Sequence, residues 1–138
     1  MNSKVKIWGL GIGPGDPELI TLKARKILQN VDVIAYPALD GGESLVRSIA
    51  EPHFINKQEE IKISIPMLVD RYPAQDIYDA AALKISMAVE SGKSVAILCE
   101  GDPFFYGSFM YLFVRLTEKY LVEVVPGVTS LAACSSAL

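Results

Sequence analysis

The chain has 138 residues, of which 51% are hydrophobic and 21% charged, and its formal net charge at pH 7 is −3. This length suits one domain with a sizeable core, and the apolar fraction excludes a disordered chain. The acidic balance argues against a nucleic-acid partner, and no apolar run approaches the ~18 residues of a membrane span. Because no signal-peptide pattern begins the chain, we expect a cytoplasmic protein whose two cysteines, Cys99 and Cys134, stay reduced.

Apolar runs and turn residues predict strands and helices in alternation. Strands are expected at 5–10, 32–36, 60–65, 94–98 and 121–125, and helices at 18–29, 44–50, 73–91, 106–119 and from 128 onward. This order predicts an α/β fold with a mostly parallel sheet and helices on both faces. The last helix pattern still continues at Leu138 without a capping glycine or a polar tail, so we expect a chain cut inside a larger protein.

Three turns rich in glycine and proline each follow a predicted strand and precede a predicted helix. They span residues 9–17, 99–107 and 124–130. Right-handed crossovers between parallel strands would bring these turns to one edge of the sheet, where the carboxyl ends of strands commonly bind ligands. Gly101 would let the backbone approach a ligand closely, and Asp102 would place a carboxylate at the mouth. Together the turns predict one ligand-binding crevice.

The sequence departs from several other site patterns. A dinucleotide fingerprint, G-x-G-x-x-G, needs glycine at position 14 or 16, where the chain has Pro14 and Asp16. A metal site is disfavoured because the chain has a single histidine, His53, and two cysteines far apart in the sequence. No supporting residues accompany that histidine in an arrangement typical of nucleophilic catalysis. We therefore expect neither a metal site nor a dinucleotide site.

The three turns together resemble those of the tetrapyrrole methylases, the S-adenosylmethionine-dependent enzymes of the corrin and sirohaem pathways. The matching segments are Gly-Ile-Gly-Pro-Gly-Asp-Pro at 11–17, Gly-Asp-Pro at 101–103 with Tyr-Gly at 106–107, and Pro-Gly-Val-Thr-Ser at 126–130. They occur in the family's order and span essentially the whole chain. Shorter matches are similar to one branch, the precorrin-2 or cobalt-factor II C20-methyltransferases, and lie at 35–38, 63–67 and 99–113.

The resemblance implies methyl transfer from S-adenosylmethionine to C20 of a tetrapyrrole, either precorrin-2 or cobalt-factor II. The positions that match the family's cofactor contacts are Pro14, Gly101, Asp102, Phe105, Thr129 and Ser130. A base must remove the C20 proton, directly or through tautomerisation, and the candidates are Glu100, Asp102 and Tyr106. The family closes its cofactor cleft with a second α/β domain. Residues 1–138 would then be an N-terminal domain, truncated in its last helix, that we expect to be inactive alone.

Two alternatives stay open. The chain could serve a sister branch of the corrin or sirohaem pathways, methylating a different position, or it could be a non-catalytic half-domain that self-associates. The resemblance also implies a homodimer when the protein is full length. Because the substrate has many carboxylates, basic side chains should line its trough, and the available ones are Arg25, Arg47, Lys57, Arg71 and Arg115.

Overall fold

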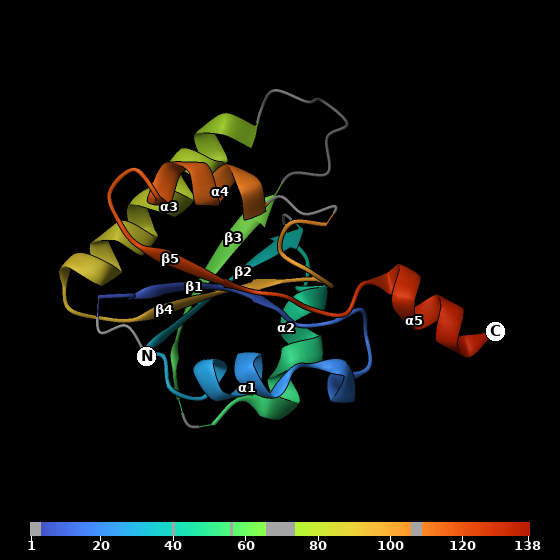
Figure 1. Ribbon diagram of the computed structural model, residues 1–138. Helices are drawn as coiled ribbons and strands as arrows, with labels where there is room; N and C mark the ends of the chain where they lie inside the picture. Colours follow the sequence, from blue (N-terminus) through green and yellow to red (C-terminus); the bar gives the residue numbers. More distant parts are fainter. Residues whose placement is uncertain (1–3, 40, 56, 66–73, 106–108) are drawn as a thin grey trace.

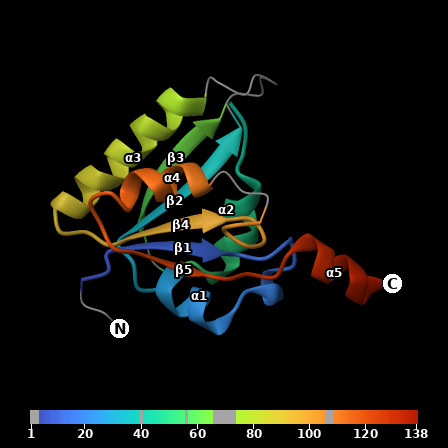
Figure 2. The same ribbon diagram turned by 45° about the horizontal axis from the view of Figure 1, so that its top comes forward.

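The fold is built on a parallel β-sheet (Figures 1 and 2). The computed structural model describes residues 4–39, 41–55, 57–65, 74–105 and 109–138. Its five strands lie in the order β3-β2-β4-β1-β5, and every pair is parallel. The strands are β1 (Ile7–Gly11), β2 (Val33–Leu39), β3 (Glu59–Ile65), β4 (Val95–Cys99) and β5 (Val122–Val125).

Two pairs of helices cover the two faces of the sheet. Helices α1 (Leu22–Leu28) and α2 (Leu45–Ala50) pack on one face, and α3 (Ala74–Glu90) and α4 (Phe109–Leu116) pack on the other. Successive side chains of a strand point to opposite faces, so Trp8 and Leu10 of β1 join the first core while Ile7 joins the second. The predicted α/β class, with helices on both faces of a parallel sheet, is confirmed.

The burial of the strands follows from their place in the sheet. Strands β1 and β4 are buried at every residue, as expected for apolar strands covered by helices on both sides. Strand β3 lies at one edge, and its alternation of polar and apolar residues matches its partial exposure. Among the described residues, no helix is long and apolar enough to cross a membrane.

The structure corrects two of the predicted boundaries. The strand predicted at 32–36 continues through Pro37 to Leu39, because β2 pairs with β3 along its whole length. Its pairing with β4 ends at Ala35, and a proline is tolerated where one side of a strand is free. The helix predicted at 18–29 is divided into a 3-10 turn, η1 (Pro17–Leu19), and helix α1.

Two separate caps cause that division. The Asp16 carboxylate accepts a hydrogen bond from the Glu18 amide at 2.9 Å and begins η1. The Thr21 hydroxyl accepts one from the Ala24 amide at 3.1 Å and begins α1, with Ile20 extended between them. A second 3-10 turn, η2 (Glu51–His53), follows α2 directly. The capping oxygens of Asp16 and Thr21 each satisfy an amide that would otherwise be unpaired at a helix start.

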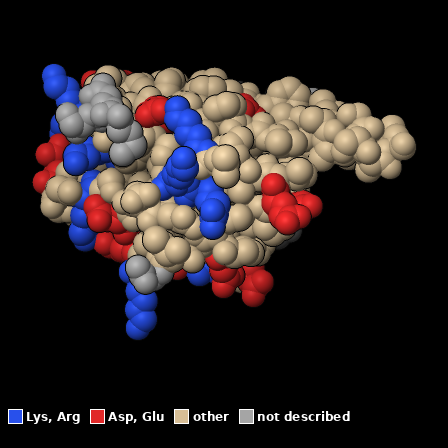
Figure 3. Space-filling model, turned by 60° about the horizontal axis from the view of Figure 1, so that its bottom comes forward, with Lys and Arg blue, Asp and Glu red and all other residues tan. Residues whose placement is uncertain are grey.

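Helix α5 (Ser130–Ala137) stands apart from the rest of the molecule. It extends away from the sheet and ends at the C-terminus of the chain (Figures 1 and 2). None of its residues is buried, and Leu131 is 61% exposed. Acidic and basic side chains are mixed over the body in Figure 3, whereas this projecting helix has no charged residue. Its apolar side chains are therefore largely exposed in the described chain.

The packing of α3 predicts unequal effects for two neighbouring apolar residues. Ile85 is fully buried in the core between α3 and the sheet, whereas Leu83 is 62% exposed. Ile85→Ala should lower the free energy of unfolding by about 2–5 kcal/mol because it leaves a cavity. Leu83→Ala should change it by less than about 0.5 kcal/mol. Urea unfolding of both variants measures this, and equal losses would contradict the described orientation of α3.

Candidate functional site

The three glycine-rich loops meet at the carboxyl edge of the sheet, as the sequence predicts. The first and second loops form an antiparallel bridge between Gly13 and Gly101. The Gly101 amide donates to the Gly13 carbonyl at 2.9 Å, and the Gly13 amide donates back at 3.3 Å. One residue earlier, the Ile12 amide donates to the Cys99 carbonyl at 2.9 Å. These bonds extend the pairing of β1 and β4 into the loops.

The third loop touches the other two through glycine backbones. A Cβ atom on Gly11 would lie 2.7 Å from the Gly101 oxygen and 2.6 Å from the Gly127 nitrogen. A Cβ atom on Gly127 would overlap the same Gly101 oxygen. Gly101 itself has a φ of +60°, which favours glycine. The three segments can approach this closely only because Gly11 and Gly127 lack a side chain, whereas at Gly101 the positive φ is the reason for glycine.

Asp102 joins the second loop to the third. One of its carboxylate oxygens accepts a hydrogen bond from the Gly127 amide at 2.9 Å, and the other accepts one from the Phe104 amide at 3.1 Å. Charge-assisted bonds to backbone amides are stronger than neutral ones. The sequence predicts that Asp102 places a carboxylate at the mouth of the crevice. In the structure one oxygen joins the second loop to the third and the other bonds within the second loop, so the side chain has a structural role at this edge.

The other predicted cofactor positions also lie in these loops. Pro14 is half-buried next to Gly13 in the first loop, and Phe105 lies in the second loop with 41% of its surface exposed. The Thr129 hydroxyl caps α5 by accepting a hydrogen bond from the Ala132 amide at 3.3 Å. Ser130 is exposed, and its hydroxyl has no hydrogen-bond partner among the described residues. Tyr106, a candidate base, lies outside the described residues.

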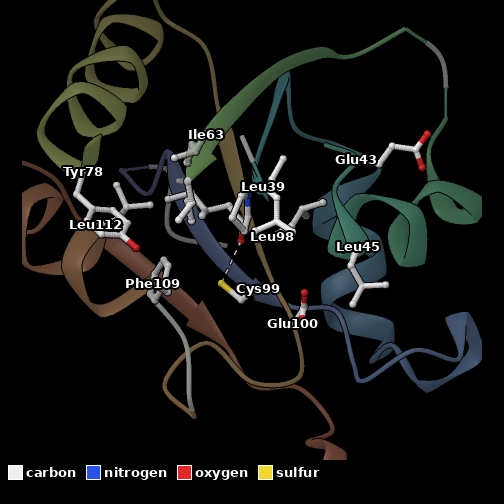
Figure 4. Close-up of a pocket in the computed structure, with 14 residues that line it drawn as sticks. Leu39, Glu43, Leu45, Ile63, Tyr78, Leu98, Cys99, Glu100, Phe109 and Leu112 are labelled. Carbon is white, nitrogen blue, oxygen red and sulfur yellow. Dashed lines mark hydrogen bonds between the residues drawn. The ribbon is translucent and has the colours of Figure 1, made fainter. Parts of the chain in front are cut away.

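A cavity of about 420 Å³ lies beside the loops (Figure 4). It opens over the carboxyl ends of β2, β3 and β4, between α2 on one side and α3 and α4 on the other. Its walls are mainly apolar, and its lining residues are Pro37, Ala38, Leu39, Glu43, Leu45, Ile63, Ile65, Tyr78, Ile97, Leu98, Cys99, Glu100, Phe109 and Leu112. Apolar cavities with few polar groups are typical of sites for small organic ligands.

The sequence analysis identified Glu100 but missed the rest of this cavity. Its apolar walls, such as Ile63 and Leu112, have the periodicity of ordinary core residues, so no sequence signal separates them from the core. The sequence signal that pointed to this region was the turn at 99–107, which follows a predicted strand. No lysine or arginine is among the described lining residues. Arg71 lies outside the described residues, and Lys57 is exposed away from the cavity lining.

Two of the predicted basic residues hold helices in place. Arg47 forms two hydrogen bonds to the Glu60 carboxylate, at 2.6 and 3.1 Å, and joins α2 to β3. The Arg47 guanidinium holds the pKa of Glu60 below its usual range. Arg115 pairs with Asp79 at 2.6 Å and joins α4 to α3. Neither arginine lines the cavity, so the expected basic trough is not formed by these two side chains.

The surroundings of Cys99 and His53 are those of side chains that support the fold. Burial, with a smaller contribution from the Asp102 charge, raises the pKa of the Cys99 thiol strongly, so the thiol stays protonated near neutral pH. His53 is on η2, and its Nε2 lies 2.7 Å from the Pro17 carbonyl oxygen. Within the described ranges, no cluster of three or more histidine, cysteine, aspartate or glutamate side chains could hold a metal ion.

Comparison with known proteins gives a consistent family. The family model for tetrapyrrole (corrin/porphyrin) methylases matches residues 6–138. The chain is 39% identical over 143 residues to a precorrin-2 C(20)-methyltransferase of a Sinorhizobium species, covering 95% of this chain and 57% of that relative.

Solved structures are similar over nearly the whole chain. The cobalt precorrin-4 methyltransferase CbiF superimposes with a TM-score of 0.75 at 31% identity, covering 99% of this chain and 52% of that one. The uroporphyrin-III C-methyltransferase of Thermus thermophilus, complexed with S-adenosylhomocysteine, gives 0.62 at 29% identity, covering 94% and 48%. The chain thus spans about half the length of these three relatives.

The contact between the loops predicts that replacing different glycines of this site by alanine has very different effects on stability. Gly127→Ala should lower the free energy of unfolding by about 1–3 kcal/mol or more, because the added methyl group overlaps the Gly101 carbonyl. Gly15→Ala is the matched control, since nothing lies within 4 Å of its Cβ position. It should change stability by less than about 0.5 kcal/mol. Thermal and urea unfolding measure both, and a Gly127 variant as stable as the control would contradict the close approach.

Proposed function

Because this chain belongs to the tetrapyrrole (corrin/porphyrin) methylase family, we propose that its three loops bind S-adenosylmethionine for methyl transfer to a tetrapyrrole. The observation that supports this most is the meeting of all three family loops at one edge of the sheet. The Thermus thermophilus neighbour, at 29% identity, is complexed with S-adenosylhomocysteine, the demethylated form of that cofactor. Bound at the loops, the cofactor would supply an activated methyl group on a sulfonium cation.

The groups at the loops suit such a ligand. The proposed contacts are Pro14, Gly101, Asp102, Phe105, Thr129 and Ser130. A cationic sulfonium is stabilised by nearby negative charge, which Asp102 supplies even while its oxygens bind amides. The Ser130 hydroxyl and the free amides at the start of α5 can bind a polar or anionic end of the ligand. The exposed ring of Phe105 offers an apolar surface next to them.

We place the reacting part of the tetrapyrrole in the apolar cavity beside the loops. There the walls of Tyr78, Phe109 and Leu112 exclude water and fix the orientation of the ring. Since the methyl group arrives already activated, alignment is the main task of these side chains. We assign the acceptor as C20 of precorrin-2 or of its cobalt form, on the 39% identity with the Sinorhizobium enzyme.

We also propose that residues 1–138 act as the N-terminal domain of a longer methyltransferase. The relatives compared above are about twice as long, and apolar side chains of α5 such as Leu131 are exposed here. A second domain, as in the family, would close the cleft above the loops. Both the cofactor and the substrate would then be shielded from water, which strengthens electrostatic interactions at the site and limits side reactions.

A sister branch of the pathway is the second candidate. The solved neighbours include a cobalt precorrin-4 methyltransferase at 31% identity, and the fold does not separate acceptors at different ring positions. Both candidates share the cofactor and the chemistry. They differ in the carbon that receives the methyl group, which is a property of the product.

Calorimetric titration with S-adenosylhomocysteine tests the cofactor site on the chain itself. We expect saturable binding by residues 1–138. Ser130→Ala should weaken it by about 1 kcal/mol, roughly fivefold, because a hydroxyl that the protein leaves unpartnered is removed. Ser135→Ala on the same helix is the control, since its hydroxyl bonds only to the Ala132 carbonyl. No heat of binding at millimolar ligand would contradict a site formed by the loops alone.

Turnover should require more than this chain. Residues 1–138 alone should transfer no methyl group to precorrin-2, because the cleft lacks the cover that shields the reaction. A chain extended past Leu138 to the length of its relatives should methylate it. Mass spectrometry and NMR of the product identify the ring position. Methylation by residues 1–138 alone would contradict the need for a second domain, and methylation at another carbon would favour the sister branch.

A further inference from the structure

We propose that Glu100 is the proton acceptor of the reaction, the carboxylate that removes the hydrogen from the carbon being methylated. This inference rests on the proposed methyltransferase function and chooses among the base candidates that the sequence left open. It depends on three observations. They are the position of Glu100 between the cavity and the loops, its freedom from other interactions, and the engagement of the neighbouring acidic groups.

Glu100 stands where the two parts of the site meet. It lines the cavity together with Leu98 and Cys99, at the carboxyl end of β4. The next residue, Gly101, contacts both of the other loops, and the three loops together are our proposed cofactor site. Figure 4 shows the Glu100 carboxyl group at the rim of the cavity, close to the end of that strand. A carbon held between cavity and loops would therefore have this carboxylate within reach.

Glu100 is also free to accept a proton. Its side chain is exposed, and no hydrogen bond or ion pair joins it to any residue in the described part of the chain. Asp102, two residues later, has both oxygens occupied by the Gly127 and Phe104 amides. Protonating Asp102 would weaken its acceptance of these bonds, including the one to the Gly127 amide that joins the second loop to the third. The same event at Glu100 would disturb no described contact.

The thiol and the second carboxyl group of the cavity are poorly suited to this step. The Cys99 thiol is buried and protonated, and it donates toward the Ile97 carbonyl at 3.7 Å. Glu43 also lines the cavity, but Figure 4 shows its carboxyl group on the far side, pointing away from Cys99 and the loops. The described lining residues include no histidine. Among the described carboxylates that line the cavity, Glu100 is thus the one on the cofactor side.

The step balances without any further reactant. The ring carbon uses an electron pair of the conjugated macrocycle to form a bond to the methyl group. The bond from that methyl group to sulfur breaks, and its electron pair stays on sulfur, so that neutral S-adenosylhomocysteine leaves. The ring is left as a cation whose methylated carbon still holds its hydrogen. Glu100 takes that proton, the electrons of the carbon–hydrogen bond return to the ring, and the protonated carboxyl group later releases the proton to water. A positioned carboxylate typically contributes about 10²–10⁴-fold to such a transfer.

The test uses the extended chain with Glu100→Gln, which keeps the shape of the side chain and removes its basicity. Glu118→Gln is the matched control, because Glu118 is exposed in the turn between α4 and β5, before the amino end of that strand. We expect Glu100→Gln to lower kcat at least 100-fold. Its affinity for S-adenosylhomocysteine should stay within about twofold, as the loop contacts are unchanged. Glu118→Gln should change neither quantity.

A second measurement separates proton removal from a loss of shape. With substrate deuterated at the methylated carbon, the isotope effect on kcat should be larger in Glu100→Gln than in the unsubstituted protein, because proton removal becomes the slow step. Glu100→Asp, which retains a carboxylate, should recover part of the rate. A Glu100→Gln variant with the unsubstituted rate and isotope effect would overturn this role while leaving the methyltransferase intact. Absence of methyl transfer in the unsubstituted extended protein would instead contradict the proposed function.

Discussion

The close approach of three backbone segments at Gly11, Gly101 and Gly127 is the constraint on which the site depends. Each segment follows a different strand, and the parallel order of β4, β1 and β5 delivers all three to one edge. The approach needs positions without side chains, since a Cβ atom at the first or third would collide with the backbone of another loop. It also needs Asp102, whose carboxylate joins the second loop to the third. The geometry of the site is therefore set by backbone contacts before any ligand binds.

This arrangement separates structural groups from those left for chemistry. Asp102 and the Thr129 hydroxyl satisfy backbone amides, and the Cys99 thiol is buried and protonated. The side chains of Ser130 and Glu100 form no hydrogen bond or ion pair with the described residues. Ser130 lies at the loops, and Glu100 lines the cavity. When a polar group without an internal partner binds a ligand, the protein breaks no internal hydrogen bond. We assign cofactor binding to the first and proton transfer to the second on this basis.

The sequence predicted the fold and the loops well because both depend on local patterns. Apolar runs identify the strands, and glycine with proline identifies the turns that follow them. The division of the 18–29 helix was missed because the caps at Asp16 and Thr21 act only two or three residues away, within one apolar pattern. The cavity was missed because its apolar lining has the same pattern as the core. The role of Asp102 depends on a contact 25 residues along the chain, which no local pattern reveals.

The central claim is that the three loops form one cofactor site. Amide NMR of ¹⁵N-labelled residues 1–138 during addition of S-adenosylhomocysteine tests it most directly, because Gly13, Gly101 and Gly127 place one amide in each loop. All three signals should shift along the same binding curve, while Gly92, in the turn between α3 and β4, stays unchanged. Shifts confined to a single loop, or no shift at saturating ligand, would contradict a shared site.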